Sequence, residues 1–308
     1  MNEQANAPMH LLKIPATSAN LGAGFDTAGL ALELYNELRF CPAEALRIEL
    51  AEPNPRIPLD SRNMIYAAAK RTADLAGRAL PPFYMKQYNH IPMASGMGSS
   101  AACIVGGILI ADTLLNLWLS KKQMLDIATQ IEGHPDNVAP AIYGGLCINQ
   151  NNEGDITTLQ IPVEGDIAVC VAYPSFALST KQSRQALPTE VTMADAVHNL
   201  SCMSFLTAAF YTQNYALLPQ ALDDRLHQPY RKHLIPGYDE VASAAQALGA
   251  YGTCLSGAGP SMLCFVKASE LSAFAEAFSR EIHKIPGSWI AIPSLINKQG
   301  ATLEEAAQ

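Results

Sequence analysis

The sequence lacks the features that would place a protein in a membrane or direct it out of the cell. Its longest apolar stretch, residues 101–111, ends at Asp112 and is shorter than the about 20 residues needed to cross a bilayer. Residues 1–10 contain neither the basic nor the apolar region of a signal peptide. We therefore expect a cytoplasmic protein that does not act at a membrane.

Paired cysteines and an excess of positive charge are missing as well. The seven cysteines form no Cys-x-x-Cys pair and mostly sit in apolar runs, which is typical of small buried side chains in a reducing compartment. The net charge is −8, which argues against nucleic acid or an anionic membrane as the main partner. Soluble globular enzymes and binding proteins remain as the classes to consider.

The chain is long enough for two domains. It has 308 residues, of which 49% are hydrophobic, so a substantial core can form. The segment 149–155 is polar and rich in turn residues, as domain boundaries usually are. We therefore divide the chain into an N-terminal domain of residues 1–155 and a C-terminal domain of residues 156–308.

Apolar spacing predicts the main elements. Expected strands cover 11–14, 31–50, 82–91, 146–148 and 167–173. Expected helices begin at Asn63, at Ser99 and after an N-cap at Ser120, and others lie within 193–222 and 269–283. The polar tail after Lys298 is expected to fray, and His227 and His233 are expected at the surface.

Residues 92–111 combine a small-residue loop with an apolar half that is compatible with a helix. Strand, glycine loop and helix in this order form phosphate sites, because glycines admit the anion and free N–H groups at the helix start stabilise its charge. No lysine lies between Lys86 and Lys121, so the P-loop motif fails, and Ala101 replaces the third glycine of the dinucleotide motif. By itself the stretch supports a tight turn about as well as a phosphate site.

Two other stretches concentrate polar residues among glycines and prolines. Residues 15–30 contain three glycines with Asn20 and Asp26, which alone suggest ordinary turn residues. Residues 132–137 crowd a glutamate, a histidine, an aspartate and an asparagine together, which allows either metal ligation or a solvated loop. Their spacing differs from that of an H-E-x-x-H metal helix. Considered alone, Arg184 is a solvated helix residue and residues 256–261 are a turn.

Two motifs together closely resemble those of the GHMP small-molecule kinases. They are P-x-x-x-G-[LM]-G-S-S-A-A at 92–102, where Met97 replaces the usual leucine at similar volume, and G-x-x-x-S-G-x-G-P-[ST] at 252–261. Four more resemble the homoserine kinases of that family. They are the loop 15–30, E-G-H-P-D-N-V-A-P-A-x-x-G-G at 132–145, S-T-x-x-[AS]-R-x-x-L-P at 179–188 and P-x-R-x-x-L-I-P at 229–236.

The resemblance spans nearly the whole chain and implies both a fold and an activity. The fold would be α+β, with an N-terminal ATP-binding domain like domain 2 of ribosomal protein S5, a ferredoxin-like C-terminal domain, and the active site between them. The activity would be ATP-dependent phosphorylation of the L-homoserine hydroxyl to O-phospho-L-homoserine, in threonine biosynthesis. Members of the family are often dimers, so a homodimer stays open.

The resemblance also implies how ATP and Mg²⁺ are held. Backbone N–H groups of the motif at 92–102 would bind the triphosphate, and Ser100 and Glu132 would supply the hard oxygen ligands that Mg²⁺ prefers. The motif comprises Pro92, Met93, Ala94, Ser95, Gly96, Met97, Gly98, Ser99, Ser100, Ala101 and Ala102. Gly257 and Gly259 would place a second stretch of backbone near the phosphates.

The remaining implied roles concern the amino acid substrate. Asn20 would hold its hydroxyl end and Asp26 its ammonium group. Arg184 and Arg231 would hold its carboxylate, for which the guanidinium has matching bidentate geometry.

Three further residues complete the implied site. His134 and Asn137 would line the substrate pocket, and Thr180 would lie at the active site. Some GHMP kinases have a catalytic aspartate where Asn137 stands here, so we expect no dedicated carboxylate base. The residues closest to the chemistry would be Ser100, Glu132, Asn137 and Thr180.

Three other functions remain possible. Another GHMP kinase, such as a mevalonate kinase, would bind a substrate without an ammonium group and leave Asp26 idle. A non-catalytic GHMP-like sensor would not need Ser100 and Glu132, which are both present. A plain ATP-binding or structural module would not need the substrate motifs.

Overall fold

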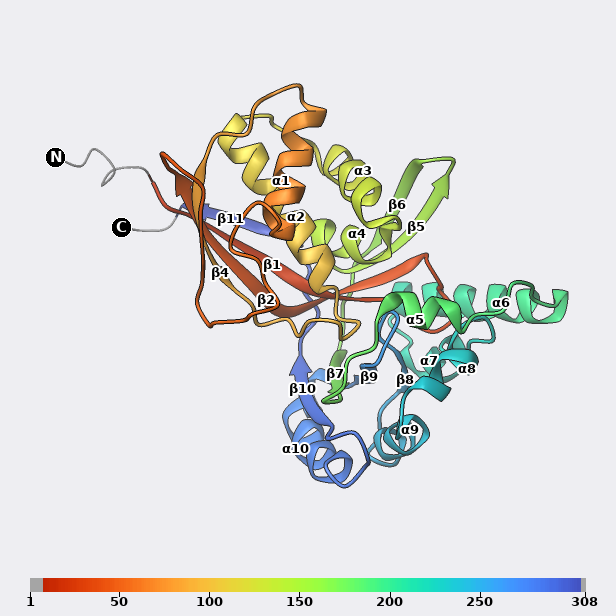
Figure 1. Cartoon of the computed structure of the whole chain (residues 1–308). Helices are drawn as coiled ribbons and strands as arrows, with labels where there is room; N and C mark the ends of the chain where they lie inside the picture. The colour runs from red at the N-terminus through yellow and green to blue at the C-terminus, as the bar shows by residue number, and fades with distance from the viewer. Residues whose placement is uncertain (1–7, 306–308) are drawn as a thin grey trace.

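The computed structural model describes residues 8–305, and residues 1–7 and 306–308 lie outside this range. The expectation about a signal peptide therefore falls mostly on residues that are not described. Figure 1 shows two lobes, each with its own sheet, and a helical arm that projects from the second lobe. Within residues 8–305, no helix is both long and apolar enough to cross a membrane.

The first lobe consists of a seven-stranded sheet with helices on one side (Figure 1). Five strands follow the order β11(Thr302–Glu305), β1(His10–Ala19), β2(Ala28–Pro42), β4(Phe83–Tyr88) and β3(Arg47–Leu50). β2 also pairs with β5(Leu146–Asn152), which pairs with β6(Asp155–Ile161). The helices are α1(Met64–Leu75), α2(Ser99–Leu115), α3(Lys121–Glu132) and α4(Pro135–Tyr143).

Helix α2 is the centre of this lobe because it is apolar on nearly every side. Most of its residues are buried, as expected for such a helix. Gly107 lets α1 approach closely, since a Cβ there would lie 2.3 Å from the carbonyl oxygen of Ile65. The predicted caps are confirmed: Asn63 caps α1, and Ser120 forms a capping box with Gln123 at the start of α3. The positions of these helices determine where the loops at their ends lie.

The second lobe is a four-stranded antiparallel sheet in the order β10(Ile290–Ser294), β7(Ala168–Tyr173), β9(Met262–Val266) and β8(Gly252–Leu255). Counted within the lobe, the fourth strand is followed by the first, the third and the second, which is the ferredoxin-like order. Helices α9(Tyr238–Ala247) and α10(Leu271–Ile282) pack on it and share its core with Trp289. The predicted fold class is confirmed.

The strands cross the predicted domain limit and include part of the tail. β6 continues the first sheet to Ile161, so the boundary placed at residue 155, which remains a prediction, falls at the start of that strand. The tail was predicted to fray, which is wrong for Thr302–Glu305, because this segment pairs with β1. The edge of a sheet has unpaired backbone N–H and C=O groups, which can pair with any extended segment whatever its side chains. The polar side chains of the tail therefore do not prevent it from forming a strand.

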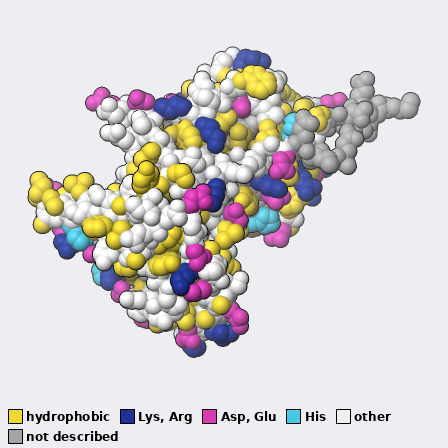
Figure 2. All heavy atoms as spheres, turned by 180° about the vertical axis from the view of Figure 1, so that it is seen from behind, with side chains coloured by type: hydrophobic (Ala, Val, Ile, Leu, Met, Phe, Trp, Pro, Cys, Tyr) yellow, Lys and Arg dark blue, Asp and Glu magenta, His cyan; other side chains and the backbone are white. Residues whose placement is uncertain are grey.

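The arm is built from short helices around one long helix. They are α5(Thr180–Gln185), α6(Met193–Tyr211), α7(Leu218–Ala221) and α8(Gln228–Arg231), with 3₁₀ turns η2(Tyr215–Leu217), η3(Lys232–Leu234) and, nearer α10, η4(Ala268–Glu270). Figure 2, which views the molecule from behind, shows hydrophobic side chains on the arm, and Met193, Leu200 and Tyr211 of α6 are exposed. Leu206 and Phe210 are buried, so the second half of α6 joins the core.

Candidate active site

A cavity of about 130 Å³ lies where the two lobes meet, and most of the predicted site residues line it. They come from the loop after β1, the start of α2, the end of α3, the start of α4, the arm and the loop after β8. These lining residues are Asn20, Asp26, Ala94, Ser95, Gly96, Gly98, Ser99, Ser100, Glu132, His134, Asn137, Thr180, Arg184, Arg231 and Gly257. A larger cavity, of about 970 Å³, lies among α6, α8 and α9 and shares no lining residue with it.

Some predicted residues do not line this cavity, and two others do. Met97 and Ala101 are fully buried and pack in the core, which explains why an apolar residue is needed at 97. The predicted residues outside the lining are Pro92, Met93, Met97, Ala101, Ala102 and Gly259. Asp136 and Ala258 line the cavity although neither was predicted to have a role there.

The glycine loop is held open by contact with the second lobe. Gly96 and Gly98 have φ values of 84° and 68°, in the left-handed region that favours glycine. The hydroxyl of Ser256 donates to the carbonyl oxygen of Gly96 at 2.8 Å. No side chain caps the start of α2, so the N–H groups of its first turn are free for an anion.

Substituting Gly96 with alanine should destabilise the protein much more than the same change at Gly77. Both glycines have a positive φ, but a Cβ at Gly96 would lie 2.1 Å from the carbonyl oxygen of Ser256, whereas Gly77 has open space around it. We expect a loss of roughly 1 kcal/mol in unfolding free energy for Gly77→Ala and at least about twice that for Gly96→Ala. Urea unfolding measures both. Equal losses would mean that the close approach of the two loops costs nothing.

Two hard oxygens lie together beside this loop. The Ser100 hydroxyl, in the first turn of α2, donates to Glu132 Oε2 at 2.8 Å. Glu132 ends α3, where Gly133 turns the chain with a φ of 96°. Within residues 8–305, no cluster of three or more His, Cys, Asp or Glu side chains could hold a metal ion. Two protein oxygens suit Mg²⁺, which usually keeps waters and takes further ligands from phosphates.

The start of α4 presents a histidine and an asparagine to the cavity. His134 Nδ1 lies 2.6 Å from Asp136 Oδ1, and this hydrogen bond raises the pKa of the imidazole. Asp136 is 2% exposed, so the pairing with His134 uses one of its oxygens away from bulk water. Asn137 Oδ1 accepts a hydrogen bond from the Thr17 hydroxyl at 2.9 Å, which orients the amide. The sequence did not single out Thr17, although it belongs to the motif at 15–30.

The loop after β1 carries three non-glycine residues with a positive φ, Asn20, Leu21 and Asp26, with φ values of 69°, 45° and 53°. The side chain of Asn20 bridges the lobes, because its oxygen accepts from the backbone N–H of Asp26 and its amide donates to the carbonyl oxygen of Gly257. Arg184 and Asp26 form a bidentate ion pair with N–O distances of 2.9 and 3.1 Å. The two residues assigned to opposite ends of the substrate therefore hold each other in this structure.

Arg231 is the most enclosed cation of the site. It is 2% exposed, and burial lowers its pKa to about 10, so it stays protonated at neutral pH. Its guanidinium lies over the ring of Phe25 at 5.2 Å. His227, expected at the surface, is fully buried against Arg231, and that expectation is wrong; His233 is exposed as expected.

Comparison with known proteins shows the family of the chain. Residues 63–145 match the GHMP kinases N terminal domain and residues 206–284 match the GHMP kinases C terminal domain. The homoserine kinase of Carboxydothermus hydrogenoformans is 43% identical over 256 residues, which is 82% of this chain and 84% of that one. The homoserine kinase of Moorella thermoacetica is 40% identical over 277 residues, or 89% and 94% of the two chains.

Solved structures agree with this assignment. The homoserine kinase of Cytophaga hutchinsonii superposes with a TM-score of 0.87 at 26% identity, over 99% of this chain and 100% of that one. A mevalonate kinase superposes with a TM-score of 0.72 at 14% identity, over 94% and 99% of the two chains, and shares the fold alone. The chain therefore belongs to the GHMP kinase family and, within it, to the homoserine kinases.

Proposed function

We propose that this chain transfers the γ-phosphoryl group of ATP to the hydroxyl of L-homoserine, which gives O-phospho-L-homoserine and ADP in the cytoplasmic synthesis of threonine. One observation carries the proposal. The cavity between the lobes brings an uncapped helix start and two hard oxygens next to one carboxylate and two guanidinium groups. The first set suits a nucleotide with its metal ion, and the second suits the charges of an α-amino acid.

The nucleotide end of the site depends on backbone rather than on a lysine. The free N–H groups at the start of α2 bind phosphate oxygens, and Gly96 and Gly98 let the anion approach the chain. Ser100 and Glu132 would hold Mg²⁺, which would supply positive charge to offset that of the phosphates. Because Glu132 is anionic, the carboxylate itself would repel the phosphates unless the metal ion lies between them.

At the amino acid end, substrate binding replaces one ion pair within the protein by several ion pairs between protein and substrate. Asp26 releases Arg184 and takes the substrate ammonium group, while Arg184 and Arg231 take the carboxylate. The Asp26–Arg184 pair is half-exposed, so breaking it costs little. Arg231 is already desolvated and forms no ion pair with a described residue, so its charge is available to a ligand. Asn20 and Asn137 then direct the hydroxyl toward the nucleotide.

No side chain is assigned the role of general base. Phosphoryl transfer has a loose transition state, so alignment and charge neutralisation contribute more than proton removal. Asn137 is neutral, and Asp136 is buried and paired with His134. The hydrogen bond to Asp136 raises the pKa of His134, which favours its cationic form more than in a free imidazole. Thr180, at the first turn of α5, also lines the cavity, where its hydroxyl can contact substrate.

A coupled ADP-release assay tests the function. With ATP and Mg²⁺ present, we expect turnover with homoserine and none above background with mevalonate or galactose. Mevalonate has no ammonium group, so it leaves the Asp26 carboxylate without a partner while Arg184 is engaged. Turnover with mevalonate would favour another GHMP kinase, and binding of homoserine without ADP release would favour a sensor.

A further inference from the structure

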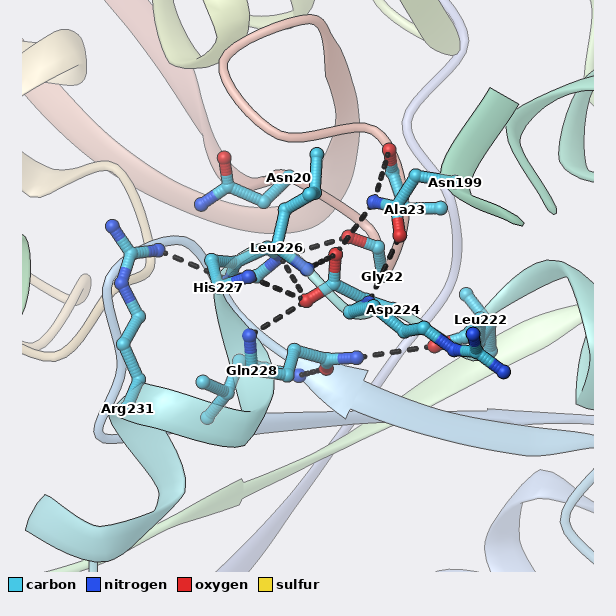
Figure 3. Close-up of polar contacts among 12 residues, drawn as sticks. Asn20, Gly22, Ala23, Asn199, Leu222, Asp224, Leu226, His227, Gln228 and Arg231 are labelled. Atoms are coloured by element: carbon cyan, nitrogen blue, oxygen red, sulfur yellow. Dashed lines mark hydrogen bonds and ion pairs between the residues drawn. The ribbon is translucent and has the colours of Figure 1, made fainter. Parts of the chain in front are cut away.

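Behind Arg231 lies a buried polar cluster that the proposed function does not use. Figure 3 shows His227, Asp224 and Gln228 packed between Arg231 and the loop that contains Gly22. His227 Nδ1 lies 3.2 Å from Arg231 Nη1, and His227 Nε2 lies 2.8 Å from the carbonyl oxygen of Gly22. The imidazole therefore touches a predicted substrate-binding group on one side and the substrate loop on the other.

The partners of His227 determine its protonation. A carbonyl oxygen only accepts hydrogen bonds, so Nε2 carries the proton that is donated to Gly22. Asp224 Oδ2, 3.5 Å from the same nitrogen, favours the proton there as well. Burial lowers the pKa of His227, so the ring is neutral at neutral pH. Nδ1 then carries a lone pair, which accepts a hydrogen bond from Arg231 Nη1.

Asp224 prevents the imidazole from moving. One of its oxygens accepts from the backbone N–H groups of His227 and Gln228, at 2.9 and 2.6 Å. The other accepts from the backbone N–H of Leu226 and from the side-chain amide of Asn199, at 3.0 and 2.7 Å. The carboxylate thus fixes the turn that carries His227.

The Phe25 ring covers one face of the Arg231 guanidinium, but few hydrogen bonds set the direction of its N–H groups within that plane. Its Nη1 lies 3.3 Å from the carbonyl oxygen of Gly257, and its Nε is buried without a hydrogen-bond partner. Within residues 8–305, no carboxylate forms an ion pair with it, so the hydrogen bonds to His227 and Gly257 set the direction of its N–H groups. With Nη1 engaged by His227 and Gly257, Nη2 and Nε are the donors left for a ligand in the cavity.

We propose that His227 is a positioning residue for substrate recognition, which orients the Arg231 guanidinium toward the carboxylate of the amino acid. The inference rests on the proposed function and deepens it. His227 does not touch the substrate. It acts through the Nδ1 lone pair, and the direction of that lone pair is fixed by the hydrogen bond from Nε2 to Gly22.

Two variants test the roles of the two ring nitrogens of His227 separately. In His227→Gln the side-chain amide can reproduce the Nε2 donor to Gly22 but offers no acceptor at the Nδ1 position. In His227→Asn the side-chain oxygen falls near the Nδ1 position and keeps the acceptor, while the donor is lost. His233→Gln makes the same chemical change at an exposed histidine and is the control. Thermal unfolding checks that each variant is folded.

The kinetics are compared for homoserine and for 3-aminopropan-1-ol, which has the same amine and hydroxyl but no carboxylate. For His227→Gln we expect kcat/KM for homoserine to fall about 10- to 100-fold, the range of a hydrogen bond to a charged group, mainly through KM. The KM for ATP and kcat/KM for 3-aminopropan-1-ol should stay within about twofold of the wild-type values, because only the carboxylate uses Arg231. For His227→Asn, any loss should be the same for both substrates.

Other results would overturn the inference. A purely structural histidine would lower kcat/KM for both substrates equally in His227→Gln, and an irrelevant one would lower neither. Failure of the proposed function has a different signature, because the wild-type protein itself would then release no ADP with homoserine. In that case calorimetry decides: if homoserine binds the wild-type protein no more tightly than His227→Gln, the inference fails too, whereas a selective loss in the variant supports it.

Discussion

Exchanging the two charges of the Asp26–Arg184 pair should leave the protein folded and reduce kcat/KM for homoserine by about 1000-fold or more. In the double variant Asp26→Arg, Arg184→Asp the ion pair can form again in the opposite sense. The charges at positions 26 and 184 are reversed while Arg231 is unchanged, however, so homoserine cannot satisfy all three groups at once and its hydroxyl is misaligned with the nucleotide. Misalignment of a reacting group by even a small distance costs orders of magnitude in rate.

The stability side of this prediction follows from exposure. The side chains of Arg184 and Asp26 are 41% and 35% exposed, and an ion pair of that kind contributes at most about 1 kcal/mol. Arginine at position 26 must adopt a φ of 53°, which adds roughly another 1–2 kcal/mol of strain. Urea unfolding should therefore detect a modest loss, too small to explain inactivity.

The single variant and a matched control complete the test. Arg184→Ala should raise KM for homoserine about 100-fold with KM for ATP unchanged, because a charge-assisted bidentate contact is lost. Swapping Glu276 and Arg280, an exposed pair on α10, should change neither constant. An effect of Arg184→Ala on ATP alone would show that the arginine does not bind the carboxylate. Normal activity of the charge-swapped enzyme would make the Asp26–Arg184 pair a structural contact only.

The same pair illustrates what the sequence could and could not predict. The motifs placed Asp26 and Arg184 in one site, and the cavity contains both. Their direct contact joins positions 158 residues apart and depends on how the arm lies against the first lobe, which no local pattern encodes. The sequence therefore indicated which residues gather, but not that they would hold each other.

His227 shows a second kind of limit. It lies in the stretch D-D-R-L-H-Q-P-Y-R, whose many charges are typical of a surface segment. Its burial comes from the loop around Gly22, 205 positions away in the sequence, which covers the imidazole and accepts a hydrogen bond from Nε2. A buried polar side chain is stable only when its hydrogen bonds are satisfied, and those partners exist only in the folded chain. The tail strand β11 is similar, because its pairing with β1 uses backbone groups.

Substituting Glu132 with glutamine should lower kcat about 100- to 1000-fold and raise the Mg²⁺ concentration needed for half-maximal activity. Glutamine has nearly the same shape, and its oxygen can still accept from the Ser100 hydroxyl, so the contact between α2 and α3 is retained. The lost charge is the one that would hold the metal ion against the phosphates, where preorganised electrostatics typically contribute at this level.

The Mg²⁺ assignment can also be tested by a binding measurement that needs no turnover. Calorimetric titration of wild-type protein with ATP should show tighter binding when Mg²⁺ is present, and Glu132→Gln should reduce that difference while leaving metal-free ATP binding the same or stronger, since a negative charge near the phosphates is gone. Glu281→Gln, which neutralises an exposed glutamate paired with Lys284, is the control and should behave as wild type. Glu132 and Ser100 are the two protein ligands that we assign to Mg²⁺. Equal Mg²⁺ dependence in wild type and Glu132→Gln would therefore show that the metal ion does not bind at these residues. The carboxylate would then face the nucleotide without a cation between them, and repulsion between like charges would make the proposed orientation of ATP untenable.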